Sequence, residues 1–274
     1  MHAVERIAFA IRHNQYLDHA DRLWNCVRPA YDRLSSLAAR RGLTRVINGA
    51  DRILVAPRWR MVAEEYEPEV WQRLMSEVRS GDVVADVGAY IGLYTIALAK
   101  RVGHAGRVVA FEPDPANLAA LREHVSLNSL TGRIETRPEA VGASTCWVKF
   151  AAHASSESSV TSSADASTAG KESMVECVSL DQVFPRARLD ILKIDVEGYE
   201  GRVIEGAMSL LKDGIRGPRA VFIEVHPYAW HETGTTSESL LGLLENCNYR
   251  VQDLAGKPVE LIEEYGEVIA YRRL

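Results

Sequence analysis

The stretch Gly81-Asp-Val-Val-Ala-Asp-Val-Gly-Ala-Tyr-Ile-Gly92 decides the fold. An apolar run over residues 83–85 leads into Asp86, and two glycines, Gly88 and Gly92, precede a helical pattern. We interpret this order as a buried parallel strand, a tight turn and the start of a helix. Gly88 lets the backbone turn and approach a ligand, and Gly92 lets the helix pack closely against the strand.

A second apolar run, over residues 108–111, ends at Glu112, twenty residues after Gly92. An acidic residue at the tip of the second strand is suited to accept hydrogen bonds from ribose hydroxyls. The two features together predict a nucleoside cofactor site at the carboxyl edge of a parallel sheet.

Asp86 indicates the kind of cofactor, because a dinucleotide turn, G-x-G-x-x-G, has its first glycine at this place. A carboxylate there repels a pyrophosphate and attracts a cationic ligand such as S-adenosylmethionine, which carries an ammonium and a sulfonium. A nicotinamide-dependent oxidoreductase on a related Rossmann-like sheet is the alternative that this carboxylate disfavours. A non-catalytic S-adenosylmethionine-binding protein is a further alternative, and only an activity assay distinguishes it from an enzyme.

The composition is that of an ordinary globular protein, with 274 residues, of which 47% are hydrophobic and 25% are charged. No apolar run approaches the roughly 18 residues that a membrane helix needs, and the first residues do not resemble a signal peptide. Four cysteines without C-x-x-C spacing are expected to be reduced and mostly buried, which favours a cytoplasmic location. The net charge of −5 argues against a nucleic-acid partner.

The chain is expected to divide into an N-terminal helical extension, residues 1–65, and a main domain, residues 66–274. An apolar stripe at helical spacing supports the extension, and its members are Trp24, Val27, Tyr31, Leu34 and Ala38. This extension is expected to cap the main domain, with a lid or a homodimer contact as the functional alternatives. Residues 151–173 are polar and of low complexity, so they are expected to form a mobile loop between strands at 146–150 and 174–178.

Two later strands also end in polar side chains. Asp195 and Glu197 follow the apolar run 189–194, and Glu224 and His226 follow the run that begins at residue 220. Ligands of open α/β sheets bind beyond the carboxyl ends of the strands, so all four side chains are expected near the glycine turn.

We predict Asp195, His226 and Glu224 as catalytic residues. A histidine has a pKa suited to removing a proton near neutrality, Asp195 can orient the acceptor, and Glu224 can support them. Asp195 could instead join a magnesium or calcium site with another carboxylate, but we predict no metal ligands. Lys193 is expected to pair with an acid, with a catalytic role as the equally weighted alternative.

A short third strand is expected at Ile134, followed by Glu139 and Ala140. The loop after this strand should lie beside an adenine ring, where Glu139 can accept from the exocyclic amine and Ala140 can donate its backbone amide. A solvated loop glutamate is the equally weighted alternative.

Five segments, DVGAYIGLYT, VVAFEPDP, EAVG, LKIDVEGYE and FIEVHP, resemble the FkbM-type S-adenosylmethionine-dependent methyltransferases in their order and spacing. The resemblance runs roughly from Tyr66 to Tyr249. It implies an α/β fold, the class I methyltransferase Rossmann-like sheet of seven strands in the order 3-2-1-4-5-7-6, with the last strand antiparallel. It also implies O-methylation of a hydroxyl on a small molecule, sugar, natural-product or glycan scaffold.

The same resemblance implies the cofactor contacts of S-adenosylmethionine. The expected cofactor-binding residues are Asp86, Gly88, Ala89, Tyr90, Gly92, Glu112, Pro113, Glu139, Ala140 and Asp195. The loop after the fourth strand reads Asp195-Val-Glu-Gly rather than the N/D-P-P-Y/F of base methylases, which ranks base methylation low. Residues 1–50 and the serine-rich loop have no counterpart in the resemblance, so the acceptor is not predicted.

Overall fold

The computed structural model describes residues 41–152, 159–161 and 171–273, and it divides the chain into two compact units at Tyr66 and Glu67. The predicted N-terminal helices, and with them the predicted homodimer contact, lie outside the described residues. In the first unit, β1 (Leu43–Ile47) and β2 (Asp51–Val55) form an antiparallel hairpin. A short 3-10 turn, η1 (Pro57–Trp59), follows the hairpin.

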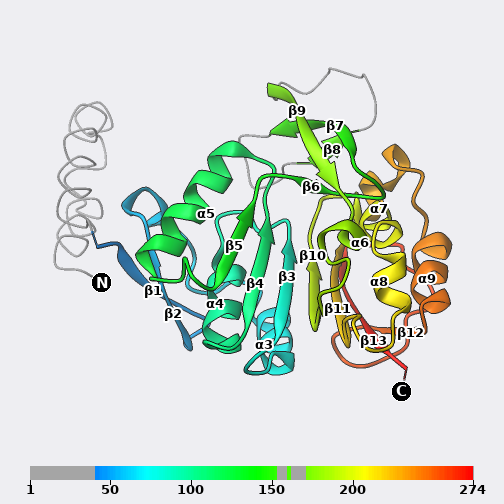
Figure 1. Cartoon of the computed structure of the whole chain (residues 1–274), viewed down its shortest axis with the longest axis horizontal. Coiled ribbons are helices and arrows are strands. Elements are labelled where there is room, and N and C mark those ends of the chain that lie inside the picture. The colour runs from blue at the N-terminus through cyan, green and yellow to red at the C-terminus, as the bar shows by residue number, and fades with distance from the viewer. Residues whose placement is uncertain (1–40, 153–158, 162–170, 274) are drawn as a thin grey trace, which may run out of the picture. The chain divides into compact units, whose positions relative to one another are not determined.

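A seven-stranded sheet forms the centre of the second unit, in the order β12-β13-β11-β10-β3-β4-β5 (Figure 1). Numbered along the chain, these strands read 3-2-1-4-5-7-6 from β5 across the sheet. The five strands from β5 to β11 are parallel, and β13 is antiparallel to both of its neighbours. The strands are β3 (Val83–Val87), β4 (Arg107–Phe111), β5 (Ile134–Arg137), β10 (Ile191–Ile194), β11 (Ala220–Val225), β12 (Tyr249–Gln252) and β13 (Gly266–Arg272).

Helices connect these strands. They are α3 (Pro68–Glu77), α4 (Leu93–Val102), α5 (Pro115–Leu127), α6 (Leu180–Val183), α7 (Glu200–Glu205), α8 (Met208–Lys212), η2 (Pro227–Glu232) and α9 (Ser237–Asn246). Asp114 caps α5 by accepting from the backbone N–H groups of Ala116 and Asn117. A capping box that joins Thr236 and Ser239 starts α9.

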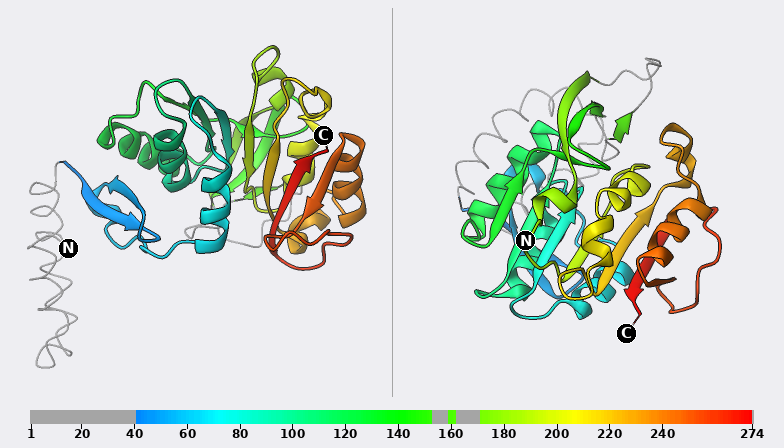
Figure 2. Two further views of the ribbon diagram at one scale, coloured as in Figure 1. Left: turned by 90° about the horizontal axis from the view of Figure 1, so that it is seen from below. Right: turned by 45° about the vertical axis from the view of Figure 1, so that its right-hand side comes forward.

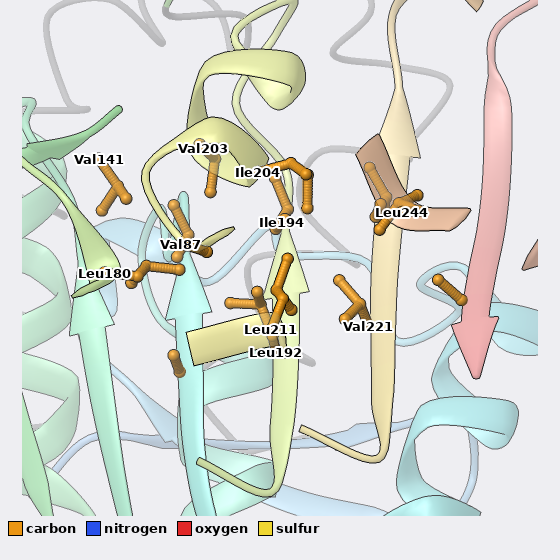
Figure 3. Close-up of a cluster of buried hydrophobic side chains, with 14 of the residues drawn as sticks. Val87, Val141, Leu180, Leu192, Ile194, Val203, Ile204, Leu211, Val221 and Leu244 are labelled. Atoms are coloured by element: carbon orange, nitrogen blue, oxygen red, sulfur yellow. The ribbon is translucent and has the colours of Figure 1, made fainter. Parts of the chain in front are cut away.

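One large hydrophobic cluster lies on one face of the sheet, where alternate strand residues meet α7, α8 and α9. Figure 3 shows part of this cluster, with Val87 of β3 and Ile194 of β10 near Val203 and Ile204 of α7. Side chains of the intervening strand positions, such as Asp86, point to the opposite face, where α4 packs. In the two further views of Figure 2, the last strand, β13 in red, lies beside β11.

A second sheet of four strands has the order β6-β9-β7-β8. It contains β6 (Ala140–Val141), β7 (Cys146–Ala152), β8 (Ser159–Thr161) and β9 (Lys171–Val178). The predicted strand pair is confirmed as β7 and β9, which are antiparallel. The prediction of one loop over residues 151–173 is wrong for Ser159–Thr161, which pairs with β7, and most of the remainder lies outside the described residues.

Two further expectations concern cysteines and membranes. Cys177 and Cys247 are buried thiols as expected, whereas Cys146 is exposed, opposite Cys177 on the neighbouring strand. Within the described part of the chain, no helix has the length and apolar character needed to cross a membrane.

Candidate cofactor and catalytic site

The glycine turn after β3 is held against two neighbouring strands. The backbone N–H groups of Gly88 and Ala89 donate to the carbonyl of Phe111 at the end of β4, at 3.1 and 2.9 Å. Gly88 has φ 84°, and a Cβ on it would lie 1.7 Å from the carbonyl oxygen of Asp195. Glycine is therefore required here both for the left-handed backbone and for the close approach of the chain after β10.

Gly92, the N-cap of α4, also has a left-handed backbone, with φ 89°. A Cβ on it would lie 2.3 Å from Cδ1 of Leu121 in α5. Gly92 was predicted to let the helix pack closely against the strand. The structure shows instead that it brings α4 close to α5.

Asp86 lies within β3 and its side chain is fully buried. Its Oδ2 accepts from the Thr95 hydroxyl of α4 at 2.5 Å, while Oδ1 has no hydrogen-bond partner among the described residues. Burial raises the pKa of Asp86, and the Lys193 ammonium opposes that shift. The carboxylate is thus not exposed for direct contact in this structure, and its role in cofactor binding stays a prediction.

Glu112 follows β4 and holds the glycine turn in place. Its Oε2 accepts from the Tyr90 backbone N–H at 2.7 Å, and its Oε1 accepts from the Asp114 N–H at 2.9 Å. Burial raises the pKa of Glu112 to about 7. Oε1 also accepts from the Asn117 side chain at 3.5 Å, so Oε2 is the oxygen that can accept a second hydrogen bond, from a ribose hydroxyl. Ala89 is buried beside Tyr90, and Pro113 is half-buried next to Glu112.

Glu139 offers an open acceptor at the expected place of the adenine. Its Oε1 accepts from Arg137 at 2.7 Å, and its buried Oε2 has no partner in the described part of the structure. Arg137 lies over the Phe111 ring. Ala140 differs from the expectation of a loop residue, because it belongs to β6 and pairs with Cys177 of β9.

Lys193 is a buried ammonium surrounded by carboxylates on the α4 face of the sheet. Its Nζ lies 3.2 Å from Asp195 Oδ2 and 4.7 Å from the centre of the Tyr94 ring, and Asp86 is its register partner on β3. Burial alone would lower the pKa of Lys193, but Asp195 and Asp86 raise it overall. The predicted pairing of Lys193 with an acid is confirmed.

Glu224 and Glu267 are register partners at the carboxyl end of β11. The Tyr265 hydroxyl donates to Oε1 of Glu224, and Oε1 of Glu267 is buried without a partner among the described residues. Burial and the charge of Asp195 raise the pKa of Glu224 to about 7, and burial raises that of Glu267 well above its ordinary value.

His226 is almost completely buried, with 2% of its side chain exposed, and its Nδ1 lies 2.8 Å from Glu200 Oε1. Glu200 also accepts from the Trp230 indole N–H, at 2.6 Å. Burial would lower the pKa of His226, but Glu200, Glu197 and Asp195 raise it to about 9. These carboxylates favour the protonated imidazole, and the role of His226 as a base near neutrality stays a prediction.

Sequence reasoning missed three residues that shape this edge: Glu200, Glu267 and Tyr265. Glu200 is the first residue of α7, and its carboxylate is bound to a histidine and a tryptophan. Glu267 and Tyr265 come from the antiparallel strand and the turn before it, which no site motif covers. Glu267 could have been found from the sequence, because it is a carboxylate at the start of an otherwise apolar strand.

The profile of the family described as "Methyltransferase FkbM domain" matches residues 86–251, which is more than half of the chain. The chain belongs to the FkbM family of S-adenosylmethionine-dependent methyltransferases. Membership in the FkbM family confirms the predicted cofactor and removes support from the nicotinamide-dependent alternative.

Two curated relatives have sequence similarity to this FkbM-family chain. The hexuronic acid methyltransferase AglP of Haloferax volcanii is 24% identical over 180 residues, 61% of this chain and 66% of the relative. The 31-O-demethyl-FK506 methyltransferase FkbM of Streptomyces tacrolimicus is 45% identical over 60 residues, 22% of each chain. The solved FkbM methyltransferase of Methylobacillus flagellatus is similar with a TM-score of 0.46 and 17% identity, over 70% of this chain and 44% of its own.

The residues of this FkbM-family chain fit S-adenosylmethionine. Gly88 leaves the turn without a side chain. Glu112 keeps an acceptor position for ribose, and the buried Oε2 of Glu139 is an open acceptor for an amine.

Proposed function

We propose that this chain transfers a methyl group from S-adenosylmethionine to a hydroxyl oxygen of a small molecule, sugar or glycan. The observation that carries the proposal is the close approach of Gly88 to the Asp195 carbonyl. It joins the turn that would hold the cofactor to the chain segment that carries the acceptor-side acids, so both lie at one edge of the sheet.

The residues divide into two groups by what they hold. Glu112 and Glu139 would bind the ribose and adenine, and the backbone of Gly88 to Tyr90 would line the methionine part. Bound there, the cofactor supplies a methyl group already activated by its sulfonium. The protein's task is then to place the acceptor oxygen in line with that methyl group and to accept the hydroxyl proton.

Asp195 and Glu224 are suited to the second task. One oxygen of each is bound, by Lys193 and by Tyr265 respectively, which fixes the two carboxylates and leaves their other oxygens for an acceptor. A hydroxyl that donates to such an oxygen is oriented, and its proton has a carboxylate to receive it.

Carboxylates outnumber ammonium groups at this edge, which bears on the acceptor. Asp195, Glu224 and Glu267 surround the ammonium of Lys193, the one lysine that the described residues show among these acids. The relative AglP is named for a hexuronic acid, but a free carboxylate would be repelled here by like charges. We therefore favour a neutral or cationic hydroxylated acceptor over an acidic one.

The test has two stages. Calorimetry should show S-adenosylhomocysteine binding to the full chain, and absence of binding at millimolar ligand would refute the cofactor assignment. Methyl transfer from labelled cofactor should then be measured on matched neutral sugars, amino sugars and uronic acids. Product mapped to nitrogen or carbon would refute O-methylation, and binding without turnover on any acceptor would favour the non-catalytic alternative.

A further inference from the structure

Three side chains at the carboxyl ends of β10 and β11 lie close enough to share one ion: Asp195, Glu197 and His226. We propose that they form a site for a divalent cation beside the acceptor position. The binding itself is independent of the proposed methyl transfer, whereas the role given to the cation below rests on it.

The distances fit a small octahedral cation. One ligand atom from each of the three residues lies within 4.8 Å of the others, and His226 Nε2 is 3.3 Å from Glu197 Oε2. With bonds of about 2.1 Å, ligand atoms of an octahedral ion are separated by about 3 Å at right angles and about 4.2 Å across. The existing spacing is therefore close to that required, and the longest gap must shrink by about half an ångström.

The setting of His226 is the second, independent observation. The side chain of Glu200 is fully buried, and it holds His226 Nδ1 through an oxygen that also accepts from the Gly198 N–H at 2.8 Å. Its other oxygen is bound by Trp230. This pairing fixes the ring so that Nε2 points at the carboxylates, which is the arrangement that carboxylates impose on metal-binding histidines.

Charge also favours a cation at this position. Nε2 of His226 lies 3.3 Å from Glu197 Oε2 and 3.8 Å from Glu224 Oε1, and Asp195 completes the group. Lys193 occupies Oδ2 of Asp195, and the Tyr228 hydroxyl donates to Glu197 Oε2 at 3.0 Å. Without an ion, the proton on Nε2 of His226 can pair with Glu197, and a bound divalent cation would take the place of that proton.

Two carboxylates and one imidazole are a donor set for Mg²⁺ or Mn²⁺ rather than for a thiolate-preferring ion. In the proposed reaction the ion would bind the acceptor oxygen and make its hydroxyl more acidic. The methyl carbon forms a bond to that oxygen, the electron pair of the broken C–S bond stays on sulfur, and the hydroxyl proton passes to Glu224 and then to water. No oxidant or reductant is needed.

Mn²⁺ is the probe, titrated into the full chain and followed by electron paramagnetic resonance. We expect one bound Mn²⁺ per chain, and at least about 10-fold weaker binding in Glu197→Gln. Glu200→Gln, which weakens the support of His226 and also alters the bonds from Gly198 and Trp230, should weaken binding by about 10- to 100-fold. Glu245→Gln, at a carboxylate 69% exposed on α9, is the matched control and should bind as the wild type does.

The proposal is overturned if Mn²⁺ fails to bind at millimolar concentration, or if Glu197→Gln and Glu245→Gln bind it equally. Circular dichroism of each variant shows whether it is folded. If Glu200→Gln does not fold, Glu197→Gln, which changes a part-exposed side chain, still tests the site. Calorimetry with S-adenosylhomocysteine on the same samples separates the two claims. If S-adenosylhomocysteine binds but Mn²⁺ does not, only the ion site is refuted. If Mn²⁺ binds but S-adenosylhomocysteine does not, only the methyl-transfer assignment is refuted.

Discussion

Alanine at position 88 should destabilise the chain much more than alanine at position 81, although both glycines have left-handed backbones, with φ 84° and 87°. The left-handed conformation costs an alanine about 1–2 kcal/mol, and a stiffer unfolded chain returns about 0.4–1 kcal/mol. Gly81→Ala should therefore cost between about 0 and 1.6 kcal/mol, since its Cβ would meet nothing nearer than Ala105 at 4.0 Å.

Gly88→Ala adds a collision with backbone. The Asp195 carbonyl oxygen would be 1.7 Å from the new Cβ, so it must move by about 1.3 Å to reach even 3.0 Å. The same residue donates its N–H to the Val87 carbonyl at 2.9 Å, and that strand bond would be strained or lost, at about 1 kcal/mol. With the disturbed packing at the strand ends, we expect a total near 3 kcal/mol or more.

Urea denaturation followed by circular dichroism measures both free energies of unfolding, and calorimetry with S-adenosylhomocysteine measures the site. Gly88→Ala should lose ligand binding, whereas Gly81→Ala should keep it. If the two variants are destabilised equally, within about 0.5 kcal/mol, the close approach to Asp195 does not exist as described. If Gly88→Ala binds the ligand as the wild type does, the turn does not hold the cofactor.

Two further predictions use the same denaturation assay. Burial raises the pKa of Glu112 from 4.5 to about 7, so between these values the folded chain binds more protons than the unfolded chain. The free energy of unfolding should then fall as the pH rises through that window, by at most about 3 kcal/mol from this group. The fall should be shallower in Glu112→Gln, and identical slopes would contradict the buried carboxyl. Lys193→Met leaves Asp195 and its neighbouring carboxylates without the buried ammonium, and it should lower the free energy of unfolding by about 3–5 kcal/mol. The control Lys100→Met, at an exposed lysine, should lower it by less than about 0.5 kcal/mol. Equal effects of the two substitutions would show that the carboxylates do not need the Lys193 charge.

The fold was predictable because the deciding signals are local. Glycines at positions 88 and 92, an acid after each of two apolar runs, and Asp114 with Pro115 at a helix start all act over a few residues. The structure shows the resulting parallel strands and helices. What the local pattern misjudged was the partner of Gly92, which is a side chain of α5 and not the strand.

The roles of the site residues were less predictable, because they depend on neighbours distant in sequence. His226 was expected to act as a base because of its ordinary pKa. Glu200, 26 positions earlier at the start of α7, bonds to the His226 ring and raises that pKa. Nothing in the motif LKIDVEGYE distinguishes an acid that begins a helix from one that holds a histidine. Asp86 likewise reads as an exposed strand tip, yet it lies inside β3 and bonds to Thr95.

Strand register, more than any motif, assembles the acidic edge. Glu224 faces Glu267 and Lys193 faces Asp86 only because β11 and β10 pair with their neighbours in one particular alignment. A slip of one residue in the β11–β13 pair would send the carboxylate of Glu267 to the opposite face, among the apolar side chains that meet α7 to α9. The hydrophobic core forbids that slip, since burying an unpaired carboxylate there would cost several kcal/mol. The apolar residues on the face covered by α7 to α9 therefore fix the strand register, and that register decides which charged groups meet at the acceptor position on the opposite face.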